Sequence, residues 1–268
     1  MRWILIVTCL AWCGVGVADE FPEDTNEIKT LTVEQAEALA ELENKRLGIS
    51  LNGLTEITPE VAVVLAKHYG DLNLRGLKEI TPEVAQALAN HGGVLDRVFG
   101  MGPPGLLLDG LTEITPEVAE ALAKSKRTLE LNGLTEITTE VAEALTRHGY
   151  WLALDGLTEI TPEVAEALAK HEESLSLNGL TKITPEVAEA LAKHYGALNL
   201  RGLKEITPEV AQALAKAKIA AFYLDGLTEI TPEVAQALVR FKGYEVCLEN
   251  IEDEEIIAIL KANPKIKF

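Results

Sequence analysis

Histidine is the side chain most often used to bind transition metals, and the five histidines of this chain share one spacing. Each follows a recurring glycine by fifteen residues: His68, His91, His148, His171 and His194. If the segments between those glycines stack, His148, His171 and His194 form a column that could hold a metal. Alternatively, each histidine lies at the negative end of a helix. We favour this second interpretation because a column does not guarantee convergent ligands, and we predict no metal and no cofactor.

The residue before each glycine forms a second polar column. Most members are asparagine or aspartate: Asn52, Arg75, Asp109, Asn132, Asp155, Asn178, Arg201, Asp225 and Glu249. Oxygen ligands in a row could bind calcium, but two arginines interrupt this one. Asn-Gly and Asp-Gly pairs are also typical of tight turns, so we interpret the column as turn chemistry.

The chain shows no pattern typical of catalysis. It has no GxSxG, HExxH or phosphate-loop motif. Its glutamates recur on helix faces and point outward in parallel, whereas paired catalytic carboxylates converge across a cleft. Cys247 has no histidine in its own unit to activate it, which favours a packed or inert thiol. We therefore predict a protein that is not an enzyme.

An internal repeat must position these residues. The recurring glycines are spaced by 23, 34, 23, 23, 23, 23 and 24 residues: Gly53, Gly76, Gly110, Gly133, Gly156, Gly179, Gly202 and Gly226. One interval is longer by 34 − 23 = 11 residues, and Leu72–Leu88 is identical to Leu198–Leu214. A period of this length indicates a solenoid, whose units bury their apolar faces only by stacking.

Each unit reads as a strand, a turn and a helix. Alternating leucines such as Leu72 and Leu74 predict the strand, and the following glycine suggests positive φ where the chain turns. Thr58, Pro59 and Glu60 are typical of a helix N-cap and first turn. Some helices also carry pairs expected to interact at i,i+4, namely Glu120 with Lys124 and Glu189 with Lys193.

The two ends of the array depart from the consensus, as an open stack requires. We expect residues 1–18 to be a signal peptide, 19–30 an acidic linker and 31–268 one solenoid with eight repeats and about nine strands. Residues 31–42 match the helix half alone and form the N-terminal cap, while about 244–268 form the C-terminal cap. Asn250 replaces glycine there, because asparagine tolerates positive φ.

The chain resembles the leucine-rich-repeat superfamily, in a short bacterial secreted type. Leu72, Leu74, Leu77 and Ile80 carry this resemblance in one unit. It implies an α/β solenoid with short parallel strands on the concave face and helices on the convex face. The commonest family pattern has an asparagine where this chain has Leu77, so the family's buried asparagine ladder is not carried over.

The resemblance implies that the outward residues of the strands line a groove where repeats of this class bind. That row comprises Ser50, Asn73, Leu107, Glu130, Ala153, Ser176, Asn199, Tyr223 and Cys247. Arginine and tyrosine dominate many binding surfaces, so Arg75, Arg201 and Tyr223 are the candidate binding residues. A solvated sheet with no ligand remains an open alternative.

The excess residues lie in an insertion loop at about 90–105. Its glycines and prolines exclude a helix, and Phe99 is apolar where a surface loop should be polar. Such a loop is either a recognition element or a plug over the core, and Phe99 is the fourth candidate binding residue.

Charge and the N-terminal sequence limit the location and partners. Arg2 and the apolar run from Trp3 to Val17 predict export with cleavage near Ala18, or retention as an uncleaved anchor. Removing Arg2 changes the net charge from −18 to −19, which disfavours nucleic acid as a partner. After cleavage we expect no membrane span, and a location that is secreted, periplasmic or at the cell surface.

These inferences favour an exported scaffold that binds a protein partner through its concave face or insertion loop. The alternative is a structural component of the cell surface or matrix without a specific ligand site. A secreted enzyme would need convergent polar residues, and the sequence shows none.

Overall fold

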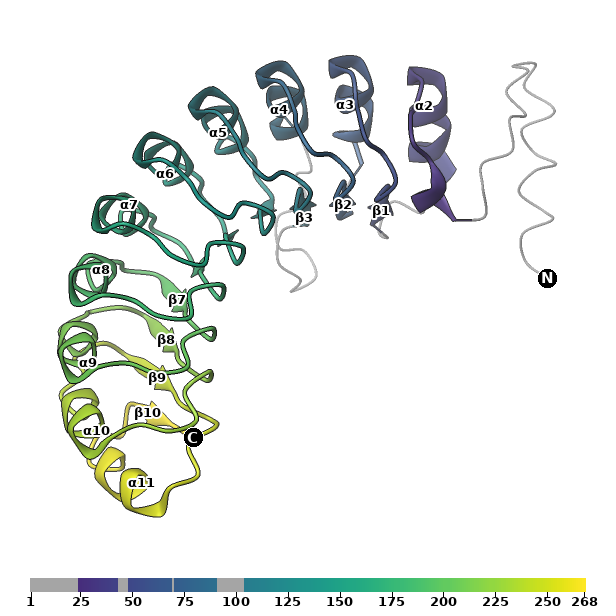
Figure 1. Ribbon diagram of the computed structural model, residues 1–268. Helices are drawn as coiled ribbons and strands as arrows, with labels where there is room; N and C mark the ends of the chain where they lie inside the picture. The colour runs from purple at the N-terminus through teal and green to yellow at the C-terminus, as the bar shows by residue number, and fades with distance from the viewer. Residues whose placement is uncertain (1–23, 43–47, 69, 91–103) are drawn as a thin grey trace, which may run out of the picture.

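The computed structural model describes residues 24–42, 48–68, 70–90 and 104–268. These residues form a curved solenoid in which each unit adds one short strand and one helix (Figure 1). The strands lie along the concave side of the arc and the helices along its convex side. This arrangement confirms the predicted α/β solenoid.

The described strands form one parallel sheet whose order follows the chain. They are β1 (Ile49–Ser50), β2 (Leu72–Asn73), β3 (Gly105–Leu107), β4 (Thr128–Glu130), β5 (Leu152–Ala153), β6 (Leu175–Ser176), β7 (Ala197–Asn199), β8 (Ala221–Tyr223), β9 (Glu245–Cys247) and β10 (Ile266–Lys267). The sequence predicts about nine strands, and β10 is the additional one. Leu72 pairs with Leu106, so the sheet stays in register across the insertion.

A 3-10 turn, η1 (Thr25–Glu27), precedes the helices. The helices are α2 (Val33–Leu42), α3 (Pro59–Leu65), α4 (Pro82–Ala89), α5 (Pro116–Leu122), α6 (Thr139–Leu145), α7 (Pro162–Leu168), α8 (Pro185–Leu191), α9 (Pro208–Ala215), α10 (Pro232–Leu238) and α11 (Glu254–Leu260). In α3 the Thr58 hydroxyl accepts a hydrogen bond from the backbone N–H of Val61, 3.4 Å away. The predicted N-cap is confirmed, and the same cap recurs through α10.

The glycine of each unit is required by close approach and not by its dihedral angle. None of the eight recurring glycines has positive φ, so that prediction is wrong. A Cβ atom at Gly156 would lie 2.2 Å from the carbonyl oxygen of Asn132 and 2.5 Å from that of Leu134. Both oxygens belong to the preceding unit, so glycine allows consecutive turns to stack. At the equivalent position in the C-terminal cap, Asn250 instead donates from its side-chain amide to the Asp225 carbonyl oxygen, 2.5 Å away.

The core is a set of stacked leucines between sheet and helices. The inward leucines of the strands and the leucine after each glycine are fully buried, as at Leu129, Leu131 and Leu134. From the helix side, Val141, Ala142 and Leu145 close the same layer. The small alanine lets the helix approach the strands, and each unit buries its apolar side only against its neighbours.

Charged side chains on the convex face join neighbouring helices. The predicted pairs within one helix, such as Glu120 with Lys124, are replaced by pairs 27 residues apart: Glu120–Arg147, Glu143–Lys170, Glu166–Lys193 and Glu189–Lys216. Each glutamate thereby joins its own helix to the next helix of the stack. All eight side chains are more than half exposed, so solvent screening leaves each pair little weight in stability.

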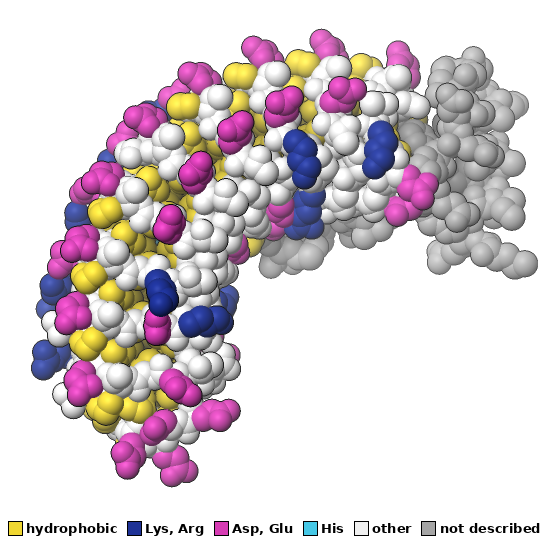
Figure 2. Space-filling view, in the orientation of Figure 1, with side chains coloured by type: hydrophobic (Ala, Val, Ile, Leu, Met, Phe, Trp, Pro, Cys, Tyr) yellow, Lys and Arg dark blue, Asp and Glu magenta, His cyan; other side chains and the backbone are white. Residues whose placement is uncertain are grey.

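Acidic side chains line the arc along its length, and basic side chains gather on the outer rim of its C-terminal half (Figure 2). In the described part of the chain, no helix has the length and hydrophobicity needed to cross a membrane. The predicted signal peptide and most of the insertion loop, including Phe99, lie outside the described residues.

Candidate functional site on the concave face

The row of strand residues predicted to line the groove lies on the concave face, and it is largely small and partly covered. Ala153, Ser176 and Cys247 are buried, and Asn73, Glu130 and the remaining members are half-buried. Exposed side chains beside this row come from the turn that follows the strand. Two of them, Arg75 and Arg201, are candidate binding residues.

Arg201 and Tyr223 form one cluster. The Arg201 guanidinium carbon lies 4.6 Å from the centre of the Tyr223 ring, a cation–π contact. Its Nε donates to Asp225 Oδ2 at 2.9 Å, and Nη1 donates to Asn199 Oδ1 at 3.4 Å. The Arg201 side chain nevertheless keeps 49% of its surface exposed. The cation is therefore held in place on the half-buried tyrosine ring while still facing solvent.

Arg75 belongs to a second cluster nearer the N-terminus. It donates to Asp109 Oδ2 at 2.5 Å and to Glu130 Oε2 at 3.1 Å. The hydrogen bond to Asp109 raises the pKa of Arg75. The pKa of Glu130 is also raised, because burial and the Asp109 charge outweigh the attraction of Arg75. Glu130 is thus more easily protonated by mild acid than an ordinary glutamate.

The two arginines do not form one site. They follow β2 and β7, five strand positions apart, which corresponds to roughly 24 Å at about 4.8 Å per strand. Any ligand that contacts both must therefore extend along the groove. Tyr223 joins the Arg201 cluster only.

The column before the glycines is a hydrogen-bonded ladder, which the sequence interpretation as turn chemistry did not foresee. Five of its members accept from the backbone N–H of the same position one unit later: Asp109 from Asn132, Asn132 from Asp155, Asp155 from Asn178, Asn178 from Arg201 and Asp225 from Glu249, at 2.8–3.2 Å. Asn26 begins the ladder by accepting from Asn52. Arg75 and Arg201 have no acceptor for the next amide, and their side chains turn to the ion pairs described above.

His148, His171 and His194 form a buried stack inside the solenoid. Consecutive ring centres lie 6.4 and 6.3 Å apart, with ring planes within 3° and 9° of parallel. His171 Nε2 lies 3.1 Å from the Tyr150 carbonyl oxygen. Rings stacked in this way cannot converge on one ion. Within the described ranges, no group of three or more His, Cys, Asp or Glu side chains could hold a metal.

Burial lowers the pKa of His148 and of His194 to about 4, and it lowers the pKa of His171 as well. Backbone groups near His148, including those of Ala123 and Trp151, reduce this shift, yet none meets hydrogen-bond geometry with its ring nitrogens. The rings are neutral at pH 7. These three histidines follow the C-terminal ends of α6, α7 and α8, as predicted, but neutral rings bring no charge to the helix dipole and act by filling space.

Cys247 lies on the concave face with its thiol buried. Burial, followed by the charges of Glu245 and Asp225, raises the pKa of the thiol to about 11. The Sγ atom lies 3.6 Å from Glu245 Oε1 and is positioned to donate to it. The thiol remains protonated at neutral pH and is a weak nucleophile, as the sequence predicts.

Arg127 is a structural residue that the sequence interpretation missed. Its side chain is buried and donates to the carbonyl oxygens of His68 and Gly70 at 2.5 Å and of Gly105 at 3.2 Å. Burial lowers its pKa to about 10, so it stays charged. These contacts join the units on either side of the insertion. In this unit Ser125 occupies the position that holds histidine in other units, and an arginine follows two residues later. That departure from the repeat was the signal in the sequence that could have identified Arg127.

No protein-family profile and no curated protein matches the sequence. Among solved structures, the chain is similar to a leucine-rich-repeat protein of Leptospira interrogans, with 22% identity and a TM-score of 0.44 over 90% of this chain. The chain spans 64% of that protein's length. It is also similar to an internalin of Listeria monocytogenes, with 16% identity and a TM-score of 0.45 over 87% of this chain and 70% of the internalin.

These likenesses are too distant to carry an argument about activity. The fold rests instead on the described units: a short parallel strand, a tight turn, a buried leucine layer and a convex helix, repeated in register. Together they are the fold of a leucine-rich-repeat solenoid.

Proposed function

We propose that this chain is an exported, non-enzymatic scaffold that binds a protein partner along its concave face. The observation that carries the proposal is the Arg201–Tyr223 cluster. It presents a half-exposed cation stacked on a half-buried aromatic ring, and both side chains are ordered by their neighbours. Arginine and tyrosine are the residue types that most often dominate protein interfaces.

Preorganisation supports this assignment. The Asp225 carboxylate and the Tyr223 ring already hold Arg201, so binding a partner there costs little side-chain entropy. The sheet beneath is rigid because each strand is paired and the ladder joins the consecutive turns from Asp109 to Arg201. A partner would thus meet a surface that is complete before binding.

The separation of the two arginine clusters indicates the shape of the partner. A compact ligand could contact Arg201 and Tyr223 or Arg75, whereas an extended surface could contact both. Asp109 and Glu130 neutralise the charge of Arg75, so this cluster presents positive and negative groups side by side. Arg201 has a single carboxylate partner and is the more available cation. We therefore assign the principal contact to the Arg201 cluster.

Capture of partners by immobilised protein tests the proposal. The test variant carries Arg75→Glu, Arg201→Glu and Tyr223→Ala. The matched control carries Arg147→Glu, Arg240→Glu and Tyr150→Ala, which make the same chemical changes away from the groove. Circular dichroism verifies that both fold. We expect one protein to be retained by the native chain and the control and lost by the test variant.

Retention by all three proteins would contradict the concave site. In that case Phe99→Ala in the insertion loop is the next variant to compare, since that loop is the second candidate for contact. Retention of nothing by the native chain would favour the structural alternative, a surface or matrix component without a specific ligand. Export itself is tested by N-terminal sequencing of the secreted protein, which we expect to begin near Asp19.

A further inference from the structure

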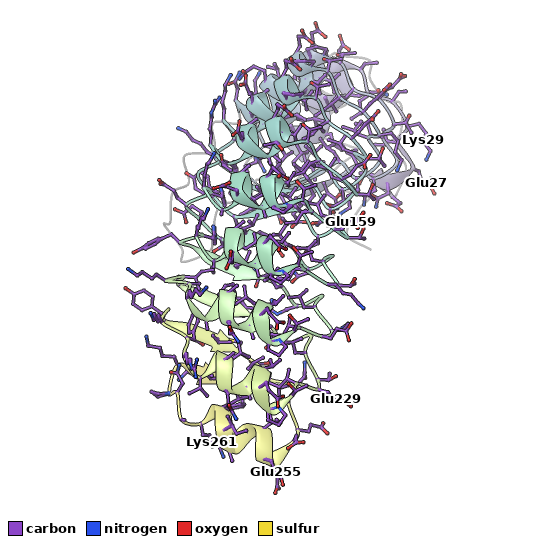
Figure 3. All side chains as sticks on the ribbon, turned by 60° about the vertical axis from the view of Figure 1, so that its left-hand side comes forward. Glu27, Lys29, Glu159, Glu229, Glu255 and Lys261 are labelled. Atoms are coloured by element: carbon purple, nitrogen blue, oxygen red, sulfur yellow. The ribbon has the colours of Figure 1, made fainter. Side chains whose placement is uncertain are left out.

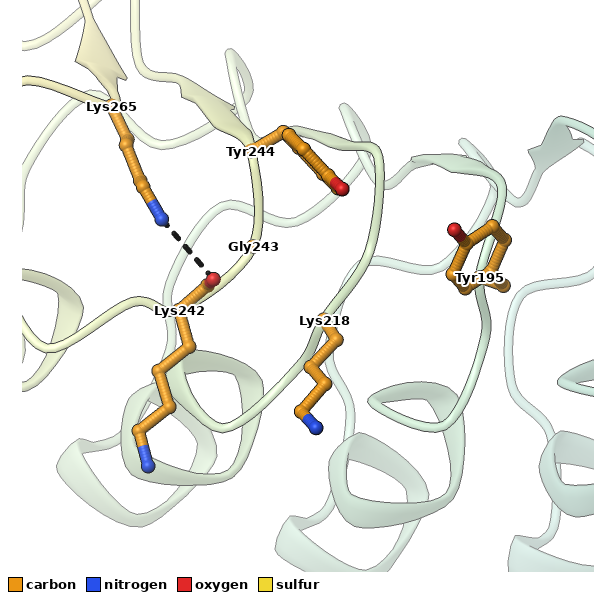
Figure 4. Close-up of a pocket in the computed structure, with 6 residues that line it drawn as sticks. All are labelled: Tyr195, Lys218, Lys242, Gly243, Tyr244 and Lys265. Atoms are coloured by element: carbon orange, nitrogen blue, oxygen red, sulfur yellow. Dashed lines mark hydrogen bonds between the residues drawn. The ribbon is translucent and has the colours of Figure 1, made fainter.

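Three lysines and two tyrosines gather on the flank where helices lead back to strands, near the C-terminal end of the solenoid. Lys218, Lys242 and Lys265 precede β8, β9 and β10. With Tyr195, Gly243 and Tyr244 they line an open cavity of about 380 Å³ (Figure 4). We call this set of six residues the lysine flank.

The lysines of this flank are not used by the fold as ion-pair partners. In the described part of the chain, none of the three lies within ion-pair distance of a carboxylate, whereas Lys193 and Lys216 on the convex face do. Lys265 Nζ donates only to the Lys242 carbonyl oxygen, at 3.2 Å. Other lysines, such as Lys67 and Lys204, also have no ion pair in the described part of the chain, but these three line one cavity in a protein with a net charge of −18.

Exposed aromatic rings accompany the lysines. Tyr195 and Tyr244 are 69% and 72% exposed, the highest values among the large apolar side chains that the structure describes. Neither ring contributes to the core. Tyrosine at a surface offers a rigid apolar face and a hydroxyl, and for this reason it is enriched in binding sites.

The opposite flank has the opposite charge. One glutamate per unit projects from the loop between strand and helix, and Glu159 and Glu229 mark this flank in Figure 3. The exposed members are Glu56, Glu79, Glu113, Glu136, Glu159, Glu205 and Glu229. Lys182 interrupts that column but pairs with Glu205 at 2.5 Å. The lysine flank is therefore the place where an anionic group meets local attraction.

We propose that the lysine flank is a second binding surface, independent of the concave face, that takes a short acidic segment of a partner protein. Its carboxylates would contact the lysines while its apolar side chains pack on the two tyrosine rings. A short segment meets the three lysines within a Debye length of about 8 Å, inside which their charge outweighs the distant glutamates.

Other anionic partners fit less well. A membrane surface, a sulfated glycan or a second copy of this chain extends beyond the flank and meets the surrounding negative charge. A second copy would also bring its own net charge of −18. Lysines bind as point charges without the forked geometry of arginine, which suits separate carboxylates.

Fluorescence anisotropy with a labelled peptide tests the proposal. The probe is a peptide of about ten residues in which glutamate and leucine alternate, and the matched probe has glutamine in place of glutamate. The test variant carries Lys218→Gln, Lys242→Gln and Lys265→Gln. The control carries Lys67→Gln, Lys78→Gln and Lys204→Gln, so both change the net charge equally. Circular dichroism confirms their folding.

We expect the acidic peptide to bind the native chain and the control, with affinity at least about tenfold weaker for the test variant and for the glutamine peptide. The Arg75→Glu, Arg201→Glu, Tyr223→Ala variant should bind it normally, which separates this surface from the groove. Equal loss in both lysine variants, or no binding by the native chain, would overturn the proposal. So would lysine-dependent binding of heparin, of phosphatidylserine vesicles or of a second copy in place of the peptide.

Discussion

Gly156 and Gly149 provide a comparison of two glycines in adjacent parts of the chain. A Cβ atom at Gly156 would lie 2.2 Å from a carbonyl oxygen of the unit before, whereas one at Gly149 would have nothing within 4 Å. Neither residue has positive φ. We therefore expect Gly156→Ala to lower the free energy of unfolding by about 1–3 kcal/mol through overpacking. Gly149→Ala should leave it unchanged or raise it by about 0.4–1 kcal/mol.

Urea denaturation followed by circular dichroism checks this difference. Similar midpoints for the two variants would mean that the turns move apart without cost, which would contradict a close-approach role.

At the scale of single residues, the sequence identified which positions are constrained better than it predicted the contacts that constrain them. Thr58 was assigned correctly because an N-cap depends only on neighbours along the chain. The role of the unit glycines was misassigned because their constraint comes from a carbonyl oxygen about 23 residues away. Arg127 was missed because its acceptors belong to other units.

The histidine stack links three successive units and gives the array a pH dependence. Folding lowers the pKa of His148 and His194 from 6.5 to about 4. The unfolded chain therefore binds protons first as the pH falls, and stability is lost between about pH 6.5 and pH 4. A shift of this size corresponds to a loss on the order of 3 kcal/mol for each of the two residues once the pH is below both values.

We expect the urea midpoint of the native chain to fall between pH 7 and pH 5. Tyr150 and Glu173 lie beside the stack, and the Glu173 charge opposes the shift at His171. The comparison variant replaces His148, His171 and His194 by serine, the residue found at the equivalent Ser125. Its midpoint should change little over this range. If the urea midpoint of the native chain changes with pH as little as that of the serine variant, the buried rings do not resist protonation.

At the element scale, helices and strands were predictable because each unit repeats the same local signals, from the strand leucines to the helix cap. Contacts between elements were less predictable. Glu120 has a suitable lysine four residues later, yet it pairs with Arg147 on the next helix. The turn ladder was also unforeseen, although its asparagines and aspartates were all identified. Both depend on the offset between stacked units, which one unit's sequence does not contain.

The helices and strands of the whole molecule pack mainly against their nearest neighbours in the stack, and this permits a test by deletion. Removing residues 156–178 joins Asp155 to Gly179 and takes out one whole unit. Asp155 would then accept from the Arg201 amide, as Asn178 does in the native chain. We expect this variant to keep its helix content per residue, measured by circular dichroism, with a modestly lower urea midpoint because one interface is lost.

The matched control removes residues 156–167 and joins Asp155 to Leu168, which places a helix end where a turn is required. Strands on either side of that junction cannot pair in register, so we expect a large loss of structure. If both deletions unfold the chain equally, its stability depends on contacts across the whole arc and the nearest-neighbour description fails. If only the control unfolds, the repeated unit of the sequence is also the unit that can be removed without unfolding the rest of the chain. Identical segments such as Leu72–Leu88 and Leu198–Leu214 then occur because their surroundings are nearly the same.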